Sequence, residues 1–224
     1  MRSSKILVAD LDGTLTRGGE DRIKPHVRRS LISARKSGWT LILATGRDRR
    51  YLMGREDLVD LFDAWVAEAG LTIYLPKTGE YLCLASESWR KKVLQLKVLP
   101  FVEEKENTIS FRLEYLDVVS AEVRRLGIDA VFKDNRGTII LLPRGVDKAY
   151  GVREALRLLG INGFMVAIGD SEVDLELLEY ADFRIAVADA DPRLRRLADY
   201  VTKSEDGDGV AEAIEKILSD LDLG

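Results

Sequence analysis

Short, continuous hydrophobic runs alternate with segments of helical periodicity near both ends of the chain. The runs lie at residues 5–10, 40–44, 64–67, 164–168 and 183–187. Such runs are typical of strands that are buried on both faces of a parallel sheet. Between the first two runs, Ile23, Val27 and Leu31 recur at helical spacing, and Gly38 follows as a stop signal. This alternation predicts an α/β fold with a doubly wound, Rossmann-like parallel sheet.

The pattern changes in the middle of the chain. Pairs of apolar segments flank turn sequences and predict hairpins over residues 72–84 and 128–142. Alternating apolar and polar positions predict a half-buried strand over residues 109–115. Helical spacing is present around residues 89–96 and 119–126. We therefore expect a small α+β module with a largely antiparallel sheet.

This module is expected at residues 77–145, and residues 1–76 and 146–224 are expected to form the core domain around it. In the core, Asp48 is expected to cap a helix that reaches about Phe62. The chain is then one doubly wound core that is interrupted by a smaller inserted module.

Composition excludes several kinds of site and partner. The 224 residues include one His and one Cys, so the chain cannot build the usual zinc site or an internal disulfide. With 34 Lys and Arg against 38 Asp and Glu, its net charge of −4 does not suit a general nucleic-acid binder. No apolar run approaches the roughly 18 residues of a membrane span. We expect a cytoplasmic protein that binds neither nucleic acid nor membranes.

Candidate chemistry gathers where the predicted strands end. The carboxyl ends of parallel strands share one edge of an open α/β sheet, and ligands bind there. The residues expected at this edge are Asp10, Asp12, Thr45, Gly46, Asp170 and Asp174, with Lys148 at the start of a helix. Side chains alternate along a strand, so the chain must turn at residues 11–13 to bring Asp10 and Asp12 to one substrate.

These residue types predict a metal-dependent phosphate site. Clustered carboxylates repel each other and stay ionised together only when cations compensate them. Oxygen ligands without His or Cys favour a hard ion such as Mg²⁺. A metal ion, a lysine and hydroxyl donors together form a set that binds phosphoryl groups.

Four motifs occur in a fixed order: Asp10-Leu-Asp-Gly-Thr14, Ala44-Thr-Gly-Arg47, Lys148 and Gly169-Asp-Ser-Glu-Val-Asp174. They resemble the motifs of the haloacid dehalogenase superfamily of Mg-dependent phosphatases. The inserted module resembles the α/β cap of the Cof-like branch. Length and cap size are most similar to those of the archaeal-type phosphoglycolate phosphatases. The resemblance implies a Mg²⁺-dependent phosphomonoester hydrolase that acts on a small phosphorylated metabolite, with 2-phosphoglycolate as the favoured substrate.

The resemblance also implies a role for each motif residue. Asp10 would be the nucleophile that forms an aspartyl-phosphate, and Asp12 would protonate the leaving oxygen and then deprotonate the attacking water. Thr45 and Gly46 would bind the phosphate, and Lys148 would neutralise its charge. The implied metal ligands are Asp10, Asp12, Asp170 and Asp174.

Several alternatives stay open at this point. Ala69, Val173 and Asp189 stand where relatives often have Asn. They leave a sugar phosphate as a rival substrate, and a phosphate-binding sensor or a structural subunit with a vestigial site as rival classes of function. Arg47 is expected either to lie at the surface or to reach the substrate, and a homodimer is a further alternative. The cap residues considered for binding a substrate carboxylate are Arg112, Lys133, Arg136 and Arg144.

Overall fold

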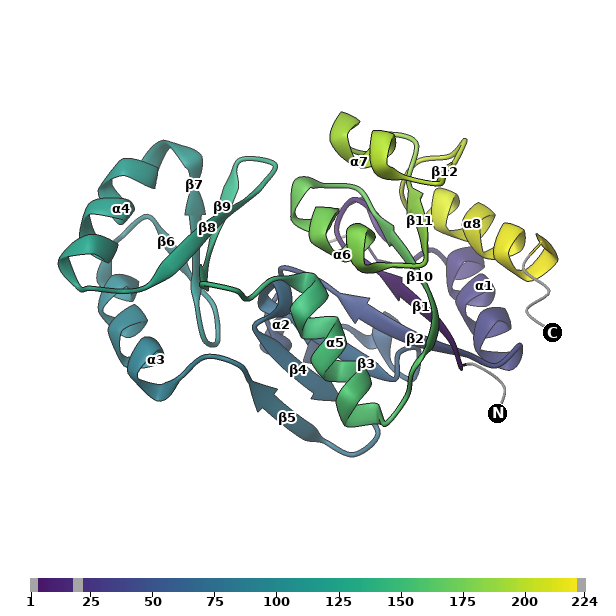
Figure 1. Cartoon of the computed structure of the whole chain (residues 1–224), viewed down its shortest axis with the longest axis horizontal. Helices are drawn as coiled ribbons and strands as arrows, with labels where there is room; N and C mark the ends of the chain where they lie inside the picture. The colour runs from purple at the N-terminus through teal and green to yellow at the C-terminus, as the bar shows by residue number, and fades with distance from the viewer. Residues whose placement is uncertain (1–3, 18–21, 221–224) are drawn as a thin grey trace.

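The computed structural model describes residues 4–17 and 22–220, which form two β-sheets flanked by helices (Figure 1). The strands of the larger sheet are β1 (Ser4–Ala9), β2 (Trp39–Ala44), β3 (Ala64–Ala67), β4 (Thr72–Leu75), β5 (Glu80–Cys83), β10 (Gly163–Gly169), β11 (Phe183–Ala186) and β12 (Tyr200–Val201). Their order is β12-β11-β10-β1-β2-β3-β4-β5. Neighbours from β12 to β3 pair in parallel, whereas β4 and β5 run antiparallel to their neighbours.

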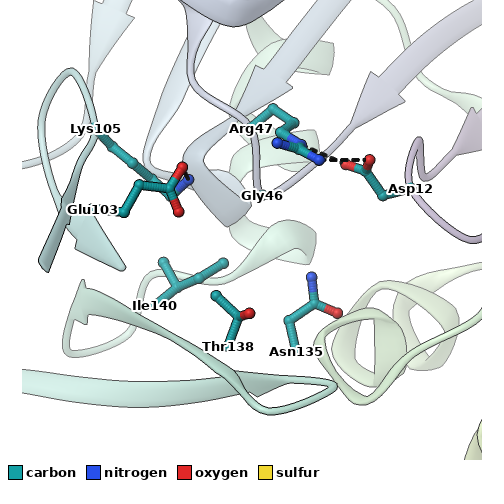
Figure 2. A pocket seen from close by; sticks show the side chains of 8 residues that line it. All are labelled: Asp12, Gly46, Arg47, Glu103, Lys105, Asn135, Thr138 and Ile140. Carbon is teal, nitrogen blue, oxygen red and sulfur yellow. Dashed lines mark hydrogen bonds and ion pairs between the residues drawn. The ribbon is translucent and has the colours of Figure 1, made fainter. Parts of the chain in front are cut away.

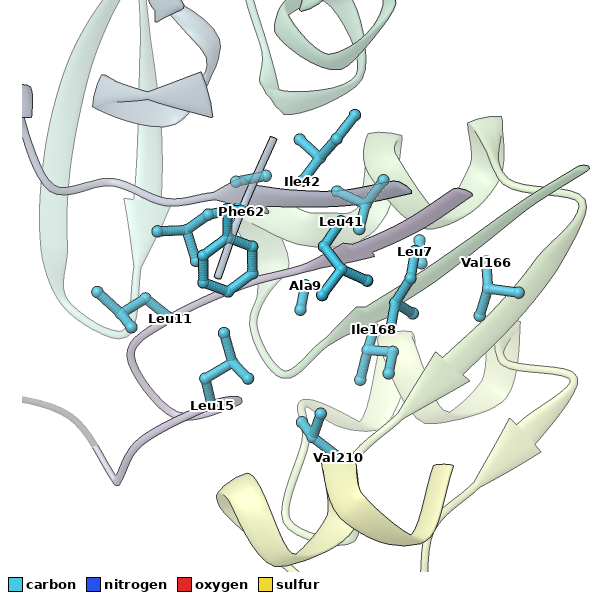
Figure 3. Packing of buried hydrophobic residues seen from close by; sticks show 14 of the residues in the cluster. Leu7, Ala9, Leu11, Leu15, Leu41, Ile42, Phe62, Val166, Ile168 and Val210 are labelled. Carbon is cyan, nitrogen blue, oxygen red and sulfur yellow. The ribbon is translucent and has the colours of Figure 1, made fainter. Parts of the chain in front are cut away.

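The centre of this sheet is buried on both faces. Leu7 of β1 pairs with Val166 of β10 and with Leu41 of β2. Figure 3 shows Val210 on the same side as this row, whereas Ile42 points to the opposite face. All five side chains are inaccessible to solvent or nearly so. Burial on both faces explains why the hydrophobic runs of these strands are continuous.

Helices cover both faces of the larger sheet. They are α1 (Pro25–Lys36), α2 (Arg49–Met53), α5 (Lys148–Leu159), α6 (Leu175–Tyr180), α7 (Pro192–Leu197) and α8 (Asp206–Asp220). Helix α1 packs against α8, while α5 packs against α6 and against strands β2 to β4. None of the helices in the described ranges is long and apolar enough to cross a membrane.

The smaller sheet is antiparallel and lies beside the larger one (Figure 1). Its strands are β6 (Val102–Glu104), β7 (Ile109–Arg112), β8 (Ala130–Asn135) and β9 (Thr138–Pro143), in the order β6-β7-β9-β8. Helices α3 (Glu87–Leu94) and α4 (Leu116–Arg125) bury Trp89, Val93 and Val123 in one apolar cluster with Phe111 of β7. We call the elements from α3 to β9, residues 87–143, the cap.

The predicted α/β class, with a parallel-rich sheet and a second antiparallel sheet, is confirmed. The hairpin of residues 72–84 is present, but both of its strands belong to the larger sheet, where Thr72 pairs with Cys83. Residues 80–83 therefore lie in the larger sheet, although the expected boundary at residue 77 assigned them to the insertion. The division of the chain into domains otherwise stays a prediction.

Three local predictions differ from the structure. Helix α2 ends at Met53 rather than near Phe62, because an Arg55–Asp57 ion pair and a hydrogen bond from Ile23 N to Asp57 hold the next residues in a separate 3-10 turn. Strand β7 ends at Arg112, and a 3-10 turn follows it. Strand β6 was not predicted, since only one of its three residues is apolar.

Candidate active site

Three buried carboxylates meet where β1 and β10 end. Asp10 follows β1, Asp170 follows β10, and Asp174 ends the 3-10 turn η5 (Glu172–Asp174). The two strands are parallel neighbours, with Ala9 opposite Ile168, so their carboxyl ends lie side by side. One carboxylate oxygen of each aspartate lies within 4.8 Å of the others. Sheet topology thus brings together residues that are far apart in sequence.

Lys148 is the first residue of α5, and its ammonium lies inside this cluster. Its Nζ donates to Asp10 Oδ1 at 2.7 Å and to Asp174 Oδ1 at 2.6 Å, and its side chain is only 1% exposed. The start of α5 lies against Gly70, where a Cβ would stand 1.9 Å from Asp147 O and where φ is +104°. Only glycine permits this approach, so the turn after β3 sets the position of Lys148.

Burial and mutual repulsion determine how these groups titrate. Burial raises the pKa of Asp10 well above its ordinary value, and although Lys148 opposes this, Asp174 and Asp170 add to the rise. Burial, and then the neighbouring Asp174, raises the pKa of Asp170 to about 6. Burial lowers the pKa of Lys148, but Asp10 and Asp174 outweigh it, and the net pKa lies above that of an ordinary lysine. Lys148 is therefore a permanent cation at neutral pH.

Asp174 and Asp170 differ in how their oxygens are engaged. Asp174 Oδ2 accepts hydrogen bonds from the backbone N–H groups of Asp170 and Ser171, and Ser171 caps the short turn. Asp170 Oδ1 accepts a hydrogen bond from Thr14 Oγ1 at 2.8 Å. Asp170 Oδ2 is buried and accepts no hydrogen bond from residues 4–17 or 22–220, although a guanidinium nitrogen of Arg136 lies 2.7 Å away. A metal ion that binds this oxygen would have to displace Arg136 from it.

These residues suit a divalent metal ion. The three carboxylates outnumber the two cations beside them, Lys148 and Arg136, and one buried oxygen has no hydrogen-bond donor. All the candidate ligand atoms are carboxylate oxygens, the donors that hard cations prefer. The glycine at position 13, with φ +86°, leaves room beside Asp170 Oδ2 that a Cβ would fill at 2.5 Å. The site therefore fits a hard divalent cation.

Asp12 lies outside the acidic cluster. Arg47 binds it in a bidentate manner, with Nε donating to Oδ2 at 2.8 Å and Nη2 donating to Oδ1 at 2.9 Å. The hydrogen bonds that Arg47 donates to Asp12 raise the pKa of Arg47 above the ordinary arginine value. Thr45 is fully buried after β2, and its hydroxyl accepts a hydrogen bond from Arg47 N. The motif after β2 thus orients Asp12. Arg47 is therefore bound to Asp12 and is not a free surface residue.

A cavity of about 180 Å³ opens between Asp12 and the cap (Figure 2). It is lined by Asp12, Gly46, Arg47, Glu103, Lys105, Asn135, Thr138 and Ile140. A Cβ on Gly46 would stand 3.0 Å from Ile140 Cδ1 of the cap, so glycine keeps this entrance open. Asp12 lines this cavity and lies in the loop that follows Asp10.

The structure places the predicted residues in two neighbouring groups. Asp10, Asp170, Asp174 and Lys148 form the acidic cluster, whereas Asp12 and Gly46 line the cavity. The roles that the family resemblance implies for these residues stay predictions.

None of the four basic residues considered for a substrate carboxylate lines the cavity. Arg112 pairs with Glu114, Lys133 with Glu176, Arg136 with Asp170 and Arg144 with Asp129. Lys105 occupies the cavity instead and was missed, because the polar run around it reads as a loop without periodicity.

Two of the three departures from the family pattern lie near the site. Ala69 is buried and has a left-handed backbone, φ 54°, which asparagine tolerates better than alanine does. Val173 is buried within η5. Asp189 is exposed, in a surface hollow that Arg136 and Ser171 also line.

Comparison with known proteins identifies the family. The family described as haloacid dehalogenase-like hydrolase matches residues 7–83 and 84–214. Phosphoglycolate phosphatase 2 of Saccharolobus solfataricus is 32% identical over 97% of this chain and 94% of its own. A phosphoglycolate phosphatase of Methanothermobacter thermautotrophicus is 30% identical over 96% of this chain and 99% of its own.

The fold agrees with this match. The crystal structure of protein 0175 from Thermoplasma acidophilum superposes with a TM-score of 0.77 at 19% identity, covering 96% of this chain and 99% of that one. The acidic cluster, the lysine and the cavity occur here on the same framework of sheets. The chain belongs to the haloacid dehalogenase-like hydrolases and is a phosphatase of that family.

Proposed function

We propose that this enzyme is a Mg²⁺-dependent phosphomonoester hydrolase that acts through an aspartyl-phosphate, with 2-phosphoglycolate as its favoured substrate. The observation that carries the proposal is the buried cluster in which Lys148 binds both Asp10 and Asp174, directly beside the cavity that Asp12 lines. A nucleophile, a fixed cation and an acid–base group are thereby available to one phosphate ester.

In the first step, an oxygen of Asp10 attacks phosphorus and the ester P–O bond breaks. Asp12 gives its proton to the leaving oxygen, and the phosphoryl group stays on Asp10. In the second step, Asp12 takes a proton from water, the water oxygen attacks phosphorus, and the acyl-phosphate bond breaks to release phosphate. Bound Mg²⁺ would offset the negative charge that builds up beside the carboxylates.

The remaining groups hold the phosphoryl oxygens and the acid in place. Lys148 keeps its charge throughout, so it stabilises the equatorial oxygens of the transferring group. Asp12 begins the cycle bound to Arg47. We expect the substrate to draw Arg47 away, so that Asp12 takes up a proton from solvent before it gives one to the leaving oxygen.

The cavity and the relatives support a small substrate. The cavity has a volume of about 180 Å³. This space suits a compact ester such as 2-phosphoglycolate. Both relatives described above are named phosphoglycolate phosphatases and align with this chain over nearly their whole length.

Phosphate release from a panel of esters tests the proposal. Wild-type enzyme is incubated with 2-phosphoglycolate and with hexose phosphates, in Mg²⁺ and in excess chelator. We expect release from 2-phosphoglycolate that chelator stops. Asp10→Asn should abolish it, while Asp117→Asn, which removes an exposed carboxylate of α4, should leave it unchanged.

Two other results of this assay would support the rival substrate or the rival class of function. Preference for a hexose phosphate would overturn the substrate and keep the reaction class. A folded protein that binds phosphate without releasing any from an ester would identify a sensor instead.

A further inference from the structure

One cationic side chain of the cavity has no hydrogen-bond partner. Lys105 follows β6, and its side chain is 8% exposed. Its Nζ lies 3.6 Å from Glu103 Oε1, beyond hydrogen-bond distance, and it donates no hydrogen bond to any residue in the ranges that the structure describes. Its ammonium faces the cavity that Asp12 lines from the opposite side (Figure 2).

The backbone around Lys105 is firmly held. Its N–H donates to Thr108 O at 3.2 Å, and its carbonyl accepts a hydrogen bond from Lys97 Nζ at 2.7 Å. The same turn is bound to the larger sheet, because the buried carboxylate of Glu68 accepts hydrogen bonds from Asn107 N and Thr108 N. Lys105 therefore has a defined position relative to Asp12, although it belongs to the cap.

The other charges of the cavity are already engaged. Arg47 is bound to Asp12 through two hydrogen bonds. Glu103 accepts a hydrogen bond from Ser110 Oγ at 2.8 Å, and its side chain is 62% exposed, so water solvates the rest of it. Lys105 is the cation of this cavity that is withdrawn from solvent, and its anion there is the solvent-exposed Glu103, at 3.6 Å.

We infer that Lys105 is the specificity-determining residue of the cap and binds the carboxylate of an anionic phosphate ester. Burial of an ammonium that donates no hydrogen bond is unfavourable, and a substrate carboxylate would supply the charge-assisted hydrogen bond that Glu103, at 3.6 Å, does not make. The inference rests on the proposed function, in which the phosphate end of the substrate lies at Asp10. A short ester that carries phosphate at one end and carboxylate at the other then spans from the acidic cluster to Lys105.

A pair of esters that differ in one group tests this inference. 2-Phosphoglycolate carries a carboxylate where 2-hydroxyethyl phosphate carries an uncharged CH₂OH group. Loss of a charged hydrogen bond predicts that Lys105→Met raises KM for 2-phosphoglycolate about 10- to 100-fold. Steady-state kinetics with 2-hydroxyethyl phosphate should change less than about threefold, because no such bond is lost. Lys91→Met, at an exposed lysine of α3, should change neither substrate.

The outcomes separate this inference from the proposed function. Equal loss with both esters, or no loss with either, would overturn the role of Lys105 and leave the phosphatase reaction intact. Failure of the wild-type enzyme to hydrolyse either ester would instead overturn the proposed function.

Charge reversal supplies a second, independent variant. Lys105→Glu should favour phosphoethanolamine, whose ammonium replaces the carboxylate, over 2-phosphoglycolate. Should neither variant fold, the wild-type enzyme alone decides: it must prefer 2-phosphoglycolate over 2-hydroxyethyl phosphate by at least about tenfold in kcat/KM. Equal use of the two esters by the wild type contradicts the inference.

Discussion

A guanidinium nitrogen of Arg136 lies 2.7 Å from Asp170 Oδ2. Arg136 belongs to the turn between β8 and β9, and Asp170 follows β10, so this ion pair joins the cap to the larger sheet at the acidic cluster. The carboxylate is 1% exposed and the arginine side chain 52% exposed. A divalent cation at Asp170 must therefore compete with a cap residue for the same oxygen.

We expect Arg136→Gln to bind Mg²⁺ about 2- to 5-fold more tightly than the wild type, because a half-exposed ion pair of about 0.2–1 kcal/mol no longer opposes the metal. Calorimetric titration without substrate measures this directly. Arg112→Gln, at a more exposed cap arginine, is the matched control and should bind like the wild type. Weaker binding by Arg136→Gln would show that the arginine supports the metal site.

Mg²⁺ should stabilise the fold through Asp170. A ligand at about 100 times its Kd that binds only the native state raises the free energy of unfolding by about 2.7 kcal/mol. Urea unfolding in Mg²⁺ and in chelator measures this difference. Asp170→Asn should lose most of it and Asp117→Asn none. Full stabilisation of Asp170→Asn would place the metal elsewhere.

Gly13 and Gly38 have nearly the same left-handed backbone, with φ +86° and φ +85°, but different surroundings. An alanine Cβ at position 13 would lie 2.5 Å from Asp170 Oδ2, whereas nothing lies within 4 Å at position 38. Gly38→Ala should lose about 1–2 kcal/mol of stability from backbone strain, and Gly13→Ala should lose more because its Cβ also overlaps Asp170. Only Gly13→Ala should also lose turnover, by about 100-fold, because it displaces Asp170. Similar kinetics for the two variants would argue against this close approach.

Glu68 should make stability depend on pH. Burial raises its pKa, although hydrogen bonds from Asn107 partly oppose the rise. The folded state then holds this proton more tightly than the unfolded chain does, so the stability that Glu68 contributes falls as pH rises above about 4.3. Relative to Glu68→Gln, wild-type unfolding free energy in urea should decrease between about pH 4.5 and 7.

A constant difference between these two proteins across that range would contradict the raised pKa. Glu87→Gln, at an exposed glutamate of α3, is the control and should follow the wild type at every pH.

The sequence predicted the parts of the site that depend on local patterns. Asp10 and Asp170 stand directly after buried strands, and parallel pairing of those strands places them together. Lys148 was predictable because it begins the helix that leads back into the core, before the next buried strand. These positions depend only on strand order and hydrophobic periodicity.

The positions of the cap residues at the site could not be predicted in the same way. Strand β6 has one apolar residue, so its sequence gives no strand pattern. Lys105 lies at the cavity because the turn after β6 is held to the larger sheet by the hydrogen bond from Asn107 N to Glu68. Arg136 was one of four residues considered for a substrate carboxylate, but the hairpin orients it toward Asp170. Such placements depend on how two sheets pack, and no spacing in the sequence encodes that contact.

Strands β1 and β10 are neighbours at the centre of the larger sheet, where Ser4 pairs with Gly163, yet the whole cap lies between them in the chain. Pairing of such distant segments loses loop-closure entropy before any contact between them forms, whereas the hairpins of the cap pair residues that are close in sequence. On the ribosome, the cap can fold while β1 still lacks one of its two neighbours. We therefore expect catalytic competence to appear last during synthesis, only after β10 has emerged from the exit tunnel and joined β1.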